Sequence, residues 1–168
     1  MQPESVREVF EGRLISVEVQ EWPAGEREIV HHPGACGVVA LTESGELLLV
    51  RQMREAVREA LLEIPAGILD RLGEDPSDCA ARELLEETGH AALSIEELAT
   101  IYTSPGFADE RIHLFLARVA DGDPEGQDGV EVVRMGLDAA IAEIEAGAIK
   151  DAKTVAAILL GWRRMQQP

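Results

Sequence analysis

The segment from Arg82 to Gly89 reads Arg-Glu-Leu-Leu-Glu-Glu-Thr-Gly and carries the residues best suited to chemistry in this chain. Residues four apart share one face of an α-helix, so Glu83 and Glu87 are expected side by side, and Arg82 lies one turn before Glu86. Two neighbouring carboxylates repel each other unless a cation lies between them. Mg²⁺ prefers oxygen ligands and commonly takes one or two protein carboxylates together with substrate phosphates. The segment therefore predicts a magnesium site, and the alternative is a solvated acidic helix face.

The expected helix that carries these residues has recognisable ends. Asp75 is the expected N-cap, Pro76 occupies the first helical position, and Asp78 lies in the first turn, where the helix dipole favours negative charge. Gly89 supplies the left-handed residue that ends the helix. Alanines and leucines between the charged residues leave an apolar surface for packing, so the glutamates can face away from the core.

The pattern around this helix resembles the signature of the Nudix hydrolases: a Gly, then a Glu, then Arg-Glu-aliphatic-x-Glu-Glu-x-Gly-aliphatic at fixed spacing. The matching positions in this chain are Glu74, Arg82, Glu83, Leu84, Glu86, Glu87 and Gly89. Two positions depart from the pattern. Gly67 precedes Glu74 by six intervening residues instead of five, which we interpret as a loop insertion, and His90 replaces the final aliphatic residue. Neither departure removes a carboxylate.

The resemblance implies a role for each charged position of the signature. Glu83 and Glu87 would be metal ligands, together with the backbone carbonyl of Ala66. Glu86 would be a ligand or hold a metal-bound water, and Arg82 would orient the glutamates. The implied metal is Mg²⁺, for which Mn²⁺ can substitute.

The sequences that flank the signature resemble the ADP-ribose pyrophosphatases within this family, and the resemblance covers nearly the whole chain. Residues 62–67 read Leu-Glu-Ile-Pro-Ala-Gly, a motif that this subfamily tends to place at the loop entrance. Pro105 lies fifteen residues after His90, which is also typical of the subfamily. Residues 50–54 resemble the strand that directs an arginine at the substrate phosphates.

Arg54, at the end of that strand, is the expected phosphate-binding residue. A planar guanidinium matches phosphate geometry in bidentate fashion, and the alternative is an ion pair with Glu55 or Glu63. Further positions assigned to the substrate on the basis of the resemblance are Gly67, Ile68 and Glu110.

A second group of substrate residues is expected on the N-terminal strands. Arg27 and Glu28 resemble residues that reach the adenine side from the partner subunit of a dimer. Trp22 would stack on the base, or it would simply pack beside Pro23. A homodimer is therefore expected, because the apolar positions of these strands need a surface to cover.

The loop from Asp121 to Glu131 is the second place where chemistry is expected. By its composition alone it is a mobile, solvated acidic loop. Related pyrophosphatases draw a general base or a further metal ligand from a glutamate in the corresponding loop. Alignment on the strand that follows places Asp128 nearest that position, with Glu125 as a rival.

Composition sets limits on function. At 168 residues the chain is one domain by length, and no apolar run approaches the roughly eighteen residues of a membrane span. The N-terminus begins no apolar signal segment, so a cytoplasmic protein is expected. A net charge of −17 argues against nucleic acid as a partner, because that affinity depends on Lys and Arg neutralising phosphates. Cys36 and Cys79 are expected as buried free thiols. His31, His32 and His113 lack the companions of a zinc site in the sequence and are interpreted as structural.

Strand and helix patterns predict the α+β class, with a mixed sheet between helices and an N-terminal β-hairpin region. The Nudix resemblance implies the same architecture, a Nudix-type α/β/α sandwich. The expected strands are 8–19, 26–31, 35–42, 46–52, 98–103, 111–120 and 130–135, and the expected late helices are 137–146 and 152–164. The chain is expected to form a single domain over 1–168. Its N-terminal strands, 1–34, would offer a dimer interface, and 35–168 would form the catalytic core.

These expectations converge on Mg²⁺-dependent hydrolysis of the diphosphate bond of ADP-ribose, giving AMP and ribose 5-phosphate. The partner would be a small nucleoside diphosphate sugar. One alternative is another member of that substrate class, such as GDP-mannose. A further alternative is a non-catalytic nucleotide sensor on a Nudix scaffold, which would usually lack the signature glutamates that this chain keeps.

Overall fold

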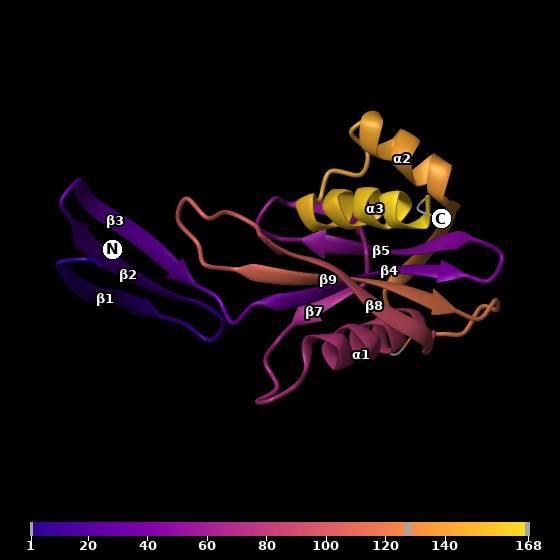
Figure 1. The fold of residues 1–168 in the computed structure, drawn as a ribbon, viewed down its shortest axis with the longest axis horizontal. Helices are drawn as coiled ribbons and strands as arrows, with labels where there is room; N and C mark the ends of the chain where they lie inside the picture. The colour runs from indigo at the N-terminus through magenta and orange to yellow at the C-terminus, as the bar shows by residue number, and fades with distance from the viewer. Residues whose placement is uncertain (1, 127–128, 167–168) are drawn as a thin grey trace.

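The computed structural model describes residues 2–126 and 129–166 (Figure 1). The strands are β1 (Ser5–Glu11), β2 (Ser16–Trp22), β3 (Gly25–His31), β4 (Ala35–Thr42), β5 (Glu46–Arg54), β6 (Glu59–Glu63), β7 (Ala66–Ile68), β8 (Ala92–Tyr102), β9 (Arg111–Val119) and β10 (Glu131–Gly136). The helices are α1 (Pro76–Thr88), α2 (Leu137–Glu145) and α3 (Ala152–Met165). In the described part of the chain, no helix has the length and the apolar content needed to cross a bilayer.

The main sheet is mixed and lies between helices, as the sequence predicts. Its strands follow the order β10-β5-β4-β9-β8, with β6 beside β5 and β7 beside β4. β4 pairs with β9 in parallel, whereas β4 pairs with β5 and with β7 antiparallel. Figure 1 shows α1 on one face of this sheet and α2 and α3 on the other. The α+β sandwich is therefore confirmed.

β4 is the centre of the core because its two faces pack against different helices. Successive side chains of a strand point to opposite faces. Val39 and Leu41 belong to the buried cluster that includes α2 and α3. Val38 and Ala40 belong to a second cluster, which includes α1. Every residue of β4 is buried, so this strand and its neighbours form a rigid support for α1 and β7.

The N-terminal region is a separate antiparallel sheet with the order β1-β2-β3, which extends away from the sandwich (Figure 1). The expectation of one continuous strand over 8–19 is wrong. The amide of Gly12 donates to the carbonyl of Ile15 at 2.8 Å, and this turn divides the segment into β1 and β2. The N-terminal region thus has three strands, and β1 is one of its two edges.

Two further differences concern the main sheet. β6 and β7 form strands that the sequence analysis does not predict, and β8 begins at Ala92 rather than at residue 98. β7 has only three residues and follows Pro65, so it is too short to show the alternation of polar and apolar residues that indicates a strand. Its pairing with β4 matters for function, because it fixes Ala66 and Gly67 beside α1.

Candidate active site

α1 begins and ends where its capping residues predict. The Asp75 side chain accepts a hydrogen bond from the amide of Ser77 at 2.9 Å, and Pro76 is the first helical residue. Gly89 adopts the left-handed conformation at φ 75°, and its amide donates to the carbonyl of Leu85. With both ends fixed, the charged residues of the helix have a defined rotation relative to the sheet.

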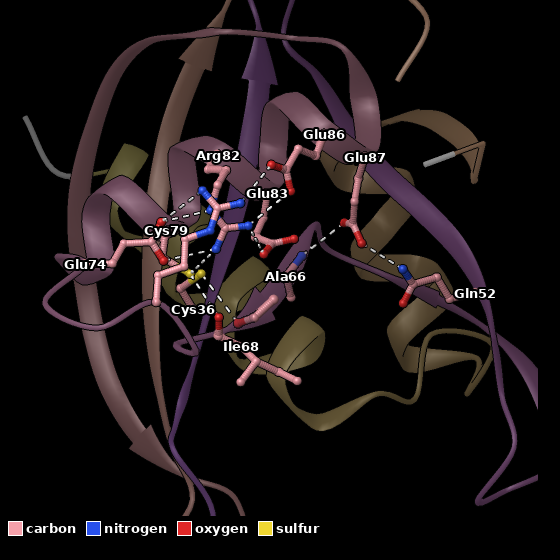
Figure 2. Close-up of polar contacts among 12 residues, drawn as sticks. Cys36, Gln52, Ala66, Ile68, Glu74, Cys79, Arg82, Glu83, Glu86 and Glu87 are labelled. Atoms are coloured by element: carbon pink, nitrogen blue, oxygen red, sulfur yellow. Dashed lines mark hydrogen bonds and ion pairs between the residues drawn. The ribbon is translucent and has the colours of Figure 1, made fainter. Parts of the chain in front are cut away.

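Arg82 is the centre of a carboxylate cluster on this helix (Figure 2). Its guanidinium binds Glu74 in bidentate fashion, with Nε at 2.8 Å and Nη2 at 3.0 Å from the two carboxylate oxygens. Nη1 lies 2.5 Å from Glu83 and 3.1 Å from Glu86. Arg71 adds a longer contact of 3.5 Å to Glu86. One guanidinium thus gathers three carboxylates, from both the preceding loop and the helix.

These ion pairs shift the protonation equilibria in the expected direction. Hydrogen bonds from Arg82 hold the pKa of Glu74 below its usual range. In turn, the hydrogen bonds from Glu74, and then those from Glu83, raise the pKa of Arg82. Glu74 and Arg82 therefore stay ionised at neutral pH.

Glu83 lies directly over the backbone of Gly67. A methyl group at Gly67 would lie only 2.0 Å from the carboxylate carbon of Glu83. Glycine is required here because any side chain would occupy the space of the carboxylate. The close approach brings a helix carboxylate onto β7, next to the Ala66 backbone that the sequence analysis assigned to the metal.

Glu87 is buried against the same strand. Its carboxylate accepts from the amide of Ala66 at 3.1 Å and from the side-chain amide of Gln52 at 2.7 Å (Figure 2). Only 3% of Glu87 is exposed, so this carboxylate is held in one orientation. The sequence analysis did not identify Gln52, because nothing local marks a residue of β5 as a partner of α1.

The donor set fits a hard divalent cation. Glu83, Glu86 and Glu87 offer carboxylate oxygens on the side of α1 next to β7, and Arg82 neutralises only part of their charge. Among the described residues, no three acidic, His or Cys side chains converge on one point closely enough to hold an ion by themselves. An ion here would take fewer side chains and complete its shell with a backbone carbonyl, water and phosphate, which is the habit of Mg²⁺.

A cavity of about 460 Å³ opens beside β7. Its lining includes Ala66, Gly67, Ile68, Arg54, Glu110 and Lys153. Five of these six residues belong to the site predicted from the sequence, and the structure brings them together around one space. Lys153, on α3, is the residue that the sequence analysis missed.

Arg54 forms the ion pair that the sequence analysis gave as its alternative. Its Nε and Nη2 atoms each lie 2.7 Å from a carboxylate oxygen of Glu63. Lys153 also binds Glu63, and it lies 3.0 Å from Asp151. Glu63 is 1% exposed, and both cations line the cavity, so the buried carboxylate holds two positive side chains at the cavity wall.

Burial by itself raises the pKa of Glu63. Hydrogen bonds from Arg54 and the charge of Lys153 outweigh burial and lower it below the ordinary value. Glu63 therefore remains an anion, and Arg54 remains fixed at the cavity. Glu110, which also lines the cavity, accepts from the hydroxyl of Thr103 at 2.7 Å.

The residues assigned to adenine do not reach this cavity within one chain. Arg27 and Glu28 line a different cavity of about 640 Å³, together with Gly106 and Phe107. Trp22 donates its indole N–H to the Gln20 side chain at 2.9 Å. Arg27 and Glu28 are thus separated from Arg54 and Gly67 in the single chain.

The candidate general bases are Glu125 and Asp128. Glu125 is exposed and lies in the loop between β9 and β10. Asp128 lies outside the described residues. The general base therefore stays a prediction.

The cysteines are free and buried, as expected. The fold gives His31 two carboxylate neighbours, although no group of His, Cys, Asp and Glu side chains in the described residues could hold a metal ion. His31 Nδ1 lies 2.6 Å from Asp109 and Nε2 lies 3.1 Å from Glu18. Asp109 and Glu18 are 78 and 13 positions from His31 along the chain, so the sequence around His31 does not show these contacts.

The NUDIX domain model matches residues 30–158, which include every charged residue of the cluster on α1. This chain belongs to the Nudix family. The match spans more than three quarters of the 168 residues and confirms the resemblance seen in the signature.

Curated relatives refine the position of the chain within the Nudix family. It is 40% identical to an ADP-ribose pyrophosphatase of Bacillus subtilis (strain 168), with 90% of this chain and 86% of that protein covered. It is 41% identical to the methanol dehydrogenase activator of Bacillus methanolicus, with the same coverage. A GDP-mannose pyrophosphatase of Cronobacter sakazakii is 34% identical, with 73% and 69% covered.

A solved structure supports the Nudix fold independently. The crystal structure of an ADP compounds hydrolase superposes with a TM-score of 0.80 at 24% identity, covering 99% of this chain and 97% of that one. At this level of identity the comparison shows the fold alone. It includes the N-terminal region, because nearly the whole chain is covered.

Proposed function

We propose that this Nudix protein hydrolyses the diphosphate bond of ADP-ribose, releasing AMP and ribose 5-phosphate. The observation that carries the proposal is the placement of Glu83 over Gly67 and of Glu87 against Ala66, at the edge of a cavity that also holds Arg54. A carboxylate site for a cation would thus lie beside a site for phosphate. The names of two pyrophosphatase relatives, 40% and 44% identical to this chain, agree with this substrate.

Glu83, Glu87 and the carbonyl of Ala66 would hold Mg²⁺, or Mn²⁺ in its place, with Glu86 as a further ligand or the holder of a bound water. When bound, the ion neutralises phosphate charge and lowers the pKa of a coordinated water. The carboxylates need a fixed orientation for this task, and the contacts from Arg82 and Gln52 supply it.

The other residues of the site bind and orient the substrate. Arg54 and Lys153 would face the diphosphate, with Glu63 holding their positions. During hydrolysis the water oxygen forms a bond to one phosphorus, and the bond from that phosphorus to the bridging oxygen breaks. A carboxylate of the β9–β10 loop, Glu125 or Asp128, would accept the proton of the water. Arg82 would act only by orienting glutamates.

We also propose a homodimer in the cytoplasm, formed through the N-terminal sheet. Val6, Val9 and Phe10 on β1 are between 46% and 53% exposed, which leaves an apolar strip on the edge strand. In a dimer, Arg27 and Glu28 would come to the partner's cavity and complete the adenine side. Light scattering after size exclusion tests this, and a monomer would remove these two residues from the proposed site.

GDP-mannose is the second candidate substrate, because several relatives with this name are at least 33% identical. A panel of ADP-ribose, GDP-mannose and free pyrophosphate, with products separated by chromatography, distinguishes the two. Preferential release of AMP from ADP-ribose, only in the presence of Mg²⁺, supports the first proposal. Tight binding of ADP-ribose without cleavage would favour the sensor instead.

Substitution of the carboxylates tests the mechanism. Glu83→Gln and Glu87→Gln should each lower turnover by at least about a hundredfold, on the scale of losing one preorganised electrostatic group. Asp78→Asn is the matched control, because it removes the same charge from an exposed position of the same helix. Near-normal turnover in both Gln variants would contradict the proposal.

A further inference from the structure

His90 stands where the resembled signature has an aliphatic residue, and the structure gives this departure a specific bonding pattern. His90 is only 5% exposed, and both ring nitrogens have partners. Nδ1 lies 3.0 Å from the carbonyl oxygen of Thr88, and Nε2 lies 3.2 Å from Nη2 of Arg134. A carbonyl only accepts and a guanidinium only donates. Nδ1 therefore carries the hydrogen, and Nε2 of a neutral imidazole accepts from Arg134.

Arg134, on β10, uses the same guanidinium to hold the start of the β9–β10 loop. Nη2 donates to the carbonyl of Gly122 and lies 3.4 Å from the carboxylate of Asp123. Nη1 lies 3.7 Å from Glu46 at the start of β5. Arg134 thus links β10, β5 and the end of α1 to the loop. Among the described residues, the hydrogen bond with His90 is the only recorded contact between Arg134 and the end of α1.

The next part of the loop lies directly on α1. A methyl group at Gly126 would lie 2.3 Å from the carbonyl oxygen of Glu87 and 3.0 Å from that of Glu86. A methyl group at Gly89 would lie 2.6 Å from the carbonyl oxygen of Glu125. Two glycines on opposite sides therefore allow backbone-to-backbone contact. The loop is seated against the turn of the helix that carries the site carboxylates.

We infer that His90 and Arg134 are positioning residues, which fix residues 121–126 of the β9–β10 loop against the carboxylate end of α1 and so hold Glu125, a candidate proton acceptor, beside the site. An aliphatic residue at position 90 cannot accept a hydrogen bond from Arg134. The positioning is thus a property of this chain's own sequence, not of the signature. The inference rests on the proposed function, because it assigns the loop a part in that reaction.

The test compares His90→Leu with His90→Gln in the full-length protein, using ADP-ribose and saturating Mg²⁺. Leu restores the residue type of the signature and suits a buried site, so the fold should be retained. Gln can place an accepting oxygen near the position of Nε2. A positioned general base contributes about 10² to 10⁴ in rate, so imperfect placement should cost about tenfold in kcat for His90→Leu. KM should change by less than about twofold, and His90→Gln should recover most of the loss.

Hydrogen exchange gives a readout that does not depend on turnover. The amides of residues 121–123, 125 and 126 should exchange faster in His90→Leu than in the wild type and in His90→Gln. Arg164→Ala is the control, because it breaks an exposed ion pair with Glu96 at 3.6 Å on another part of the surface. It should change neither kcat nor loop exchange.

Three outcomes overturn the inference. Unchanged kcat in His90→Leu means that the loop does not need this contact. Equal losses in the Leu and Gln variants mean that ring packing, not acceptance from Arg134, is what His90 supplies. Unchanged exchange in residues 121–126 means that His90 does not hold the loop. If the wild type fails to cleave ADP-ribose, the proposed function fails, but the exchange comparison still tests the anchor.

Discussion

His31 Nδ1 lies 2.6 Å from Asp109 Oδ2, and this contact joins the N-terminal sheet to the main body. It is reinforced by backbone bonds in both directions. The amide of Val30 donates to the carbonyl of Phe107 at 2.7 Å, and the amide of Asp109 donates to the carbonyl of Val30 at 3.1 Å. The orientation of β3 is therefore set by the loop that follows β8.

The first prediction concerns the pH dependence of this junction. Hydrogen bonds to Asp109, and then to Glu18, raise the pKa of His31. A raised folded-state pKa contributes stability that is complete below the ordinary value of about 6.5 and is lost as pH rises through the folded value. Burial alone raises the pKa of Asp109, but hydrogen bonds from His31 and from the His32 amide lower it overall. The stability that comes from the lowered pKa of Asp109 is lost when pH falls below about 4.

His31→Gln should thus destabilise the protein more at pH 5.5 than at pH 8.5. The difference should not exceed about 1 kcal/mol, because both side chains are partly exposed and screened by solvent. Urea unfolding at the two pH values measures it. A variant that loses more stability at pH 8.5 would show that the charged pair does not act as described.

The second prediction concerns Gly67. In Gly67→Ala, the new methyl group and the Glu83 carboxylate cannot occupy the same space. Glu83 should swing away from β7, and turnover should fall by about a hundredfold, on the scale of losing one electrostatic group. Gly136→Ala is the control, because nothing lies within 4 Å of a methyl group there. Activity of Gly67→Ala near that of Gly136→Ala would mean that the close approach has no functional part.

The third prediction concerns the buried carboxylate of Glu63. Glu63→Gln leaves Arg54 and Lys153 without their shared partner, and breaking a buried ion pair from one side costs about 3 kcal/mol. Glu59→Gln removes an exposed partner of Lys150 and should cost less than about 1 kcal/mol. Denaturant unfolding compares the two variants. Equal stability would show that Glu63 does not organise the cavity wall.

The fourth prediction concerns the thiols. The contact with Cys79, and then burial, raises the pKa of Cys36. Thiolate is the reactive form, so Cys36 should not react with a disulfide reagent in the native protein at pH 8. Cys79 should not react either, because the reagent cannot reach a fully buried side chain. Both should react after unfolding in guanidinium. Rapid modification of one thiol without unfolding would show that α1 opens away from β4.

The parts that the sequence predicts are those with local causes. The bounds of α1 follow from Asp75, Pro76 and Gly89, each of which acts on its own neighbours. The grouping of charged side chains on one face of α1 follows from the repeat of about 3.6 residues in an α-helix. β7 was missed because its three residues have no period and exist as a strand only through pairing with β4.

The cavity was only partly predictable for a related reason. Lys153 is 90 residues from Glu63 along the chain, and nothing near either residue signals the contact. The same holds for Gln52 and Glu87, which are 35 residues apart. Polar partners on different elements are chosen by the packing of those elements, so they become visible only when the fold is known.

The ion pairs of Arg82 also determine whether α1 can fold before a metal ion binds. Without a counter-ion, the carboxylates of Glu74, Glu83 and Glu86 would repel one another as α1 forms. The guanidinium offsets that repulsion from within the chain, so the helix can fold before any metal arrives. Metal removal should therefore abolish turnover and leave the folded protein intact, ready to be reloaded.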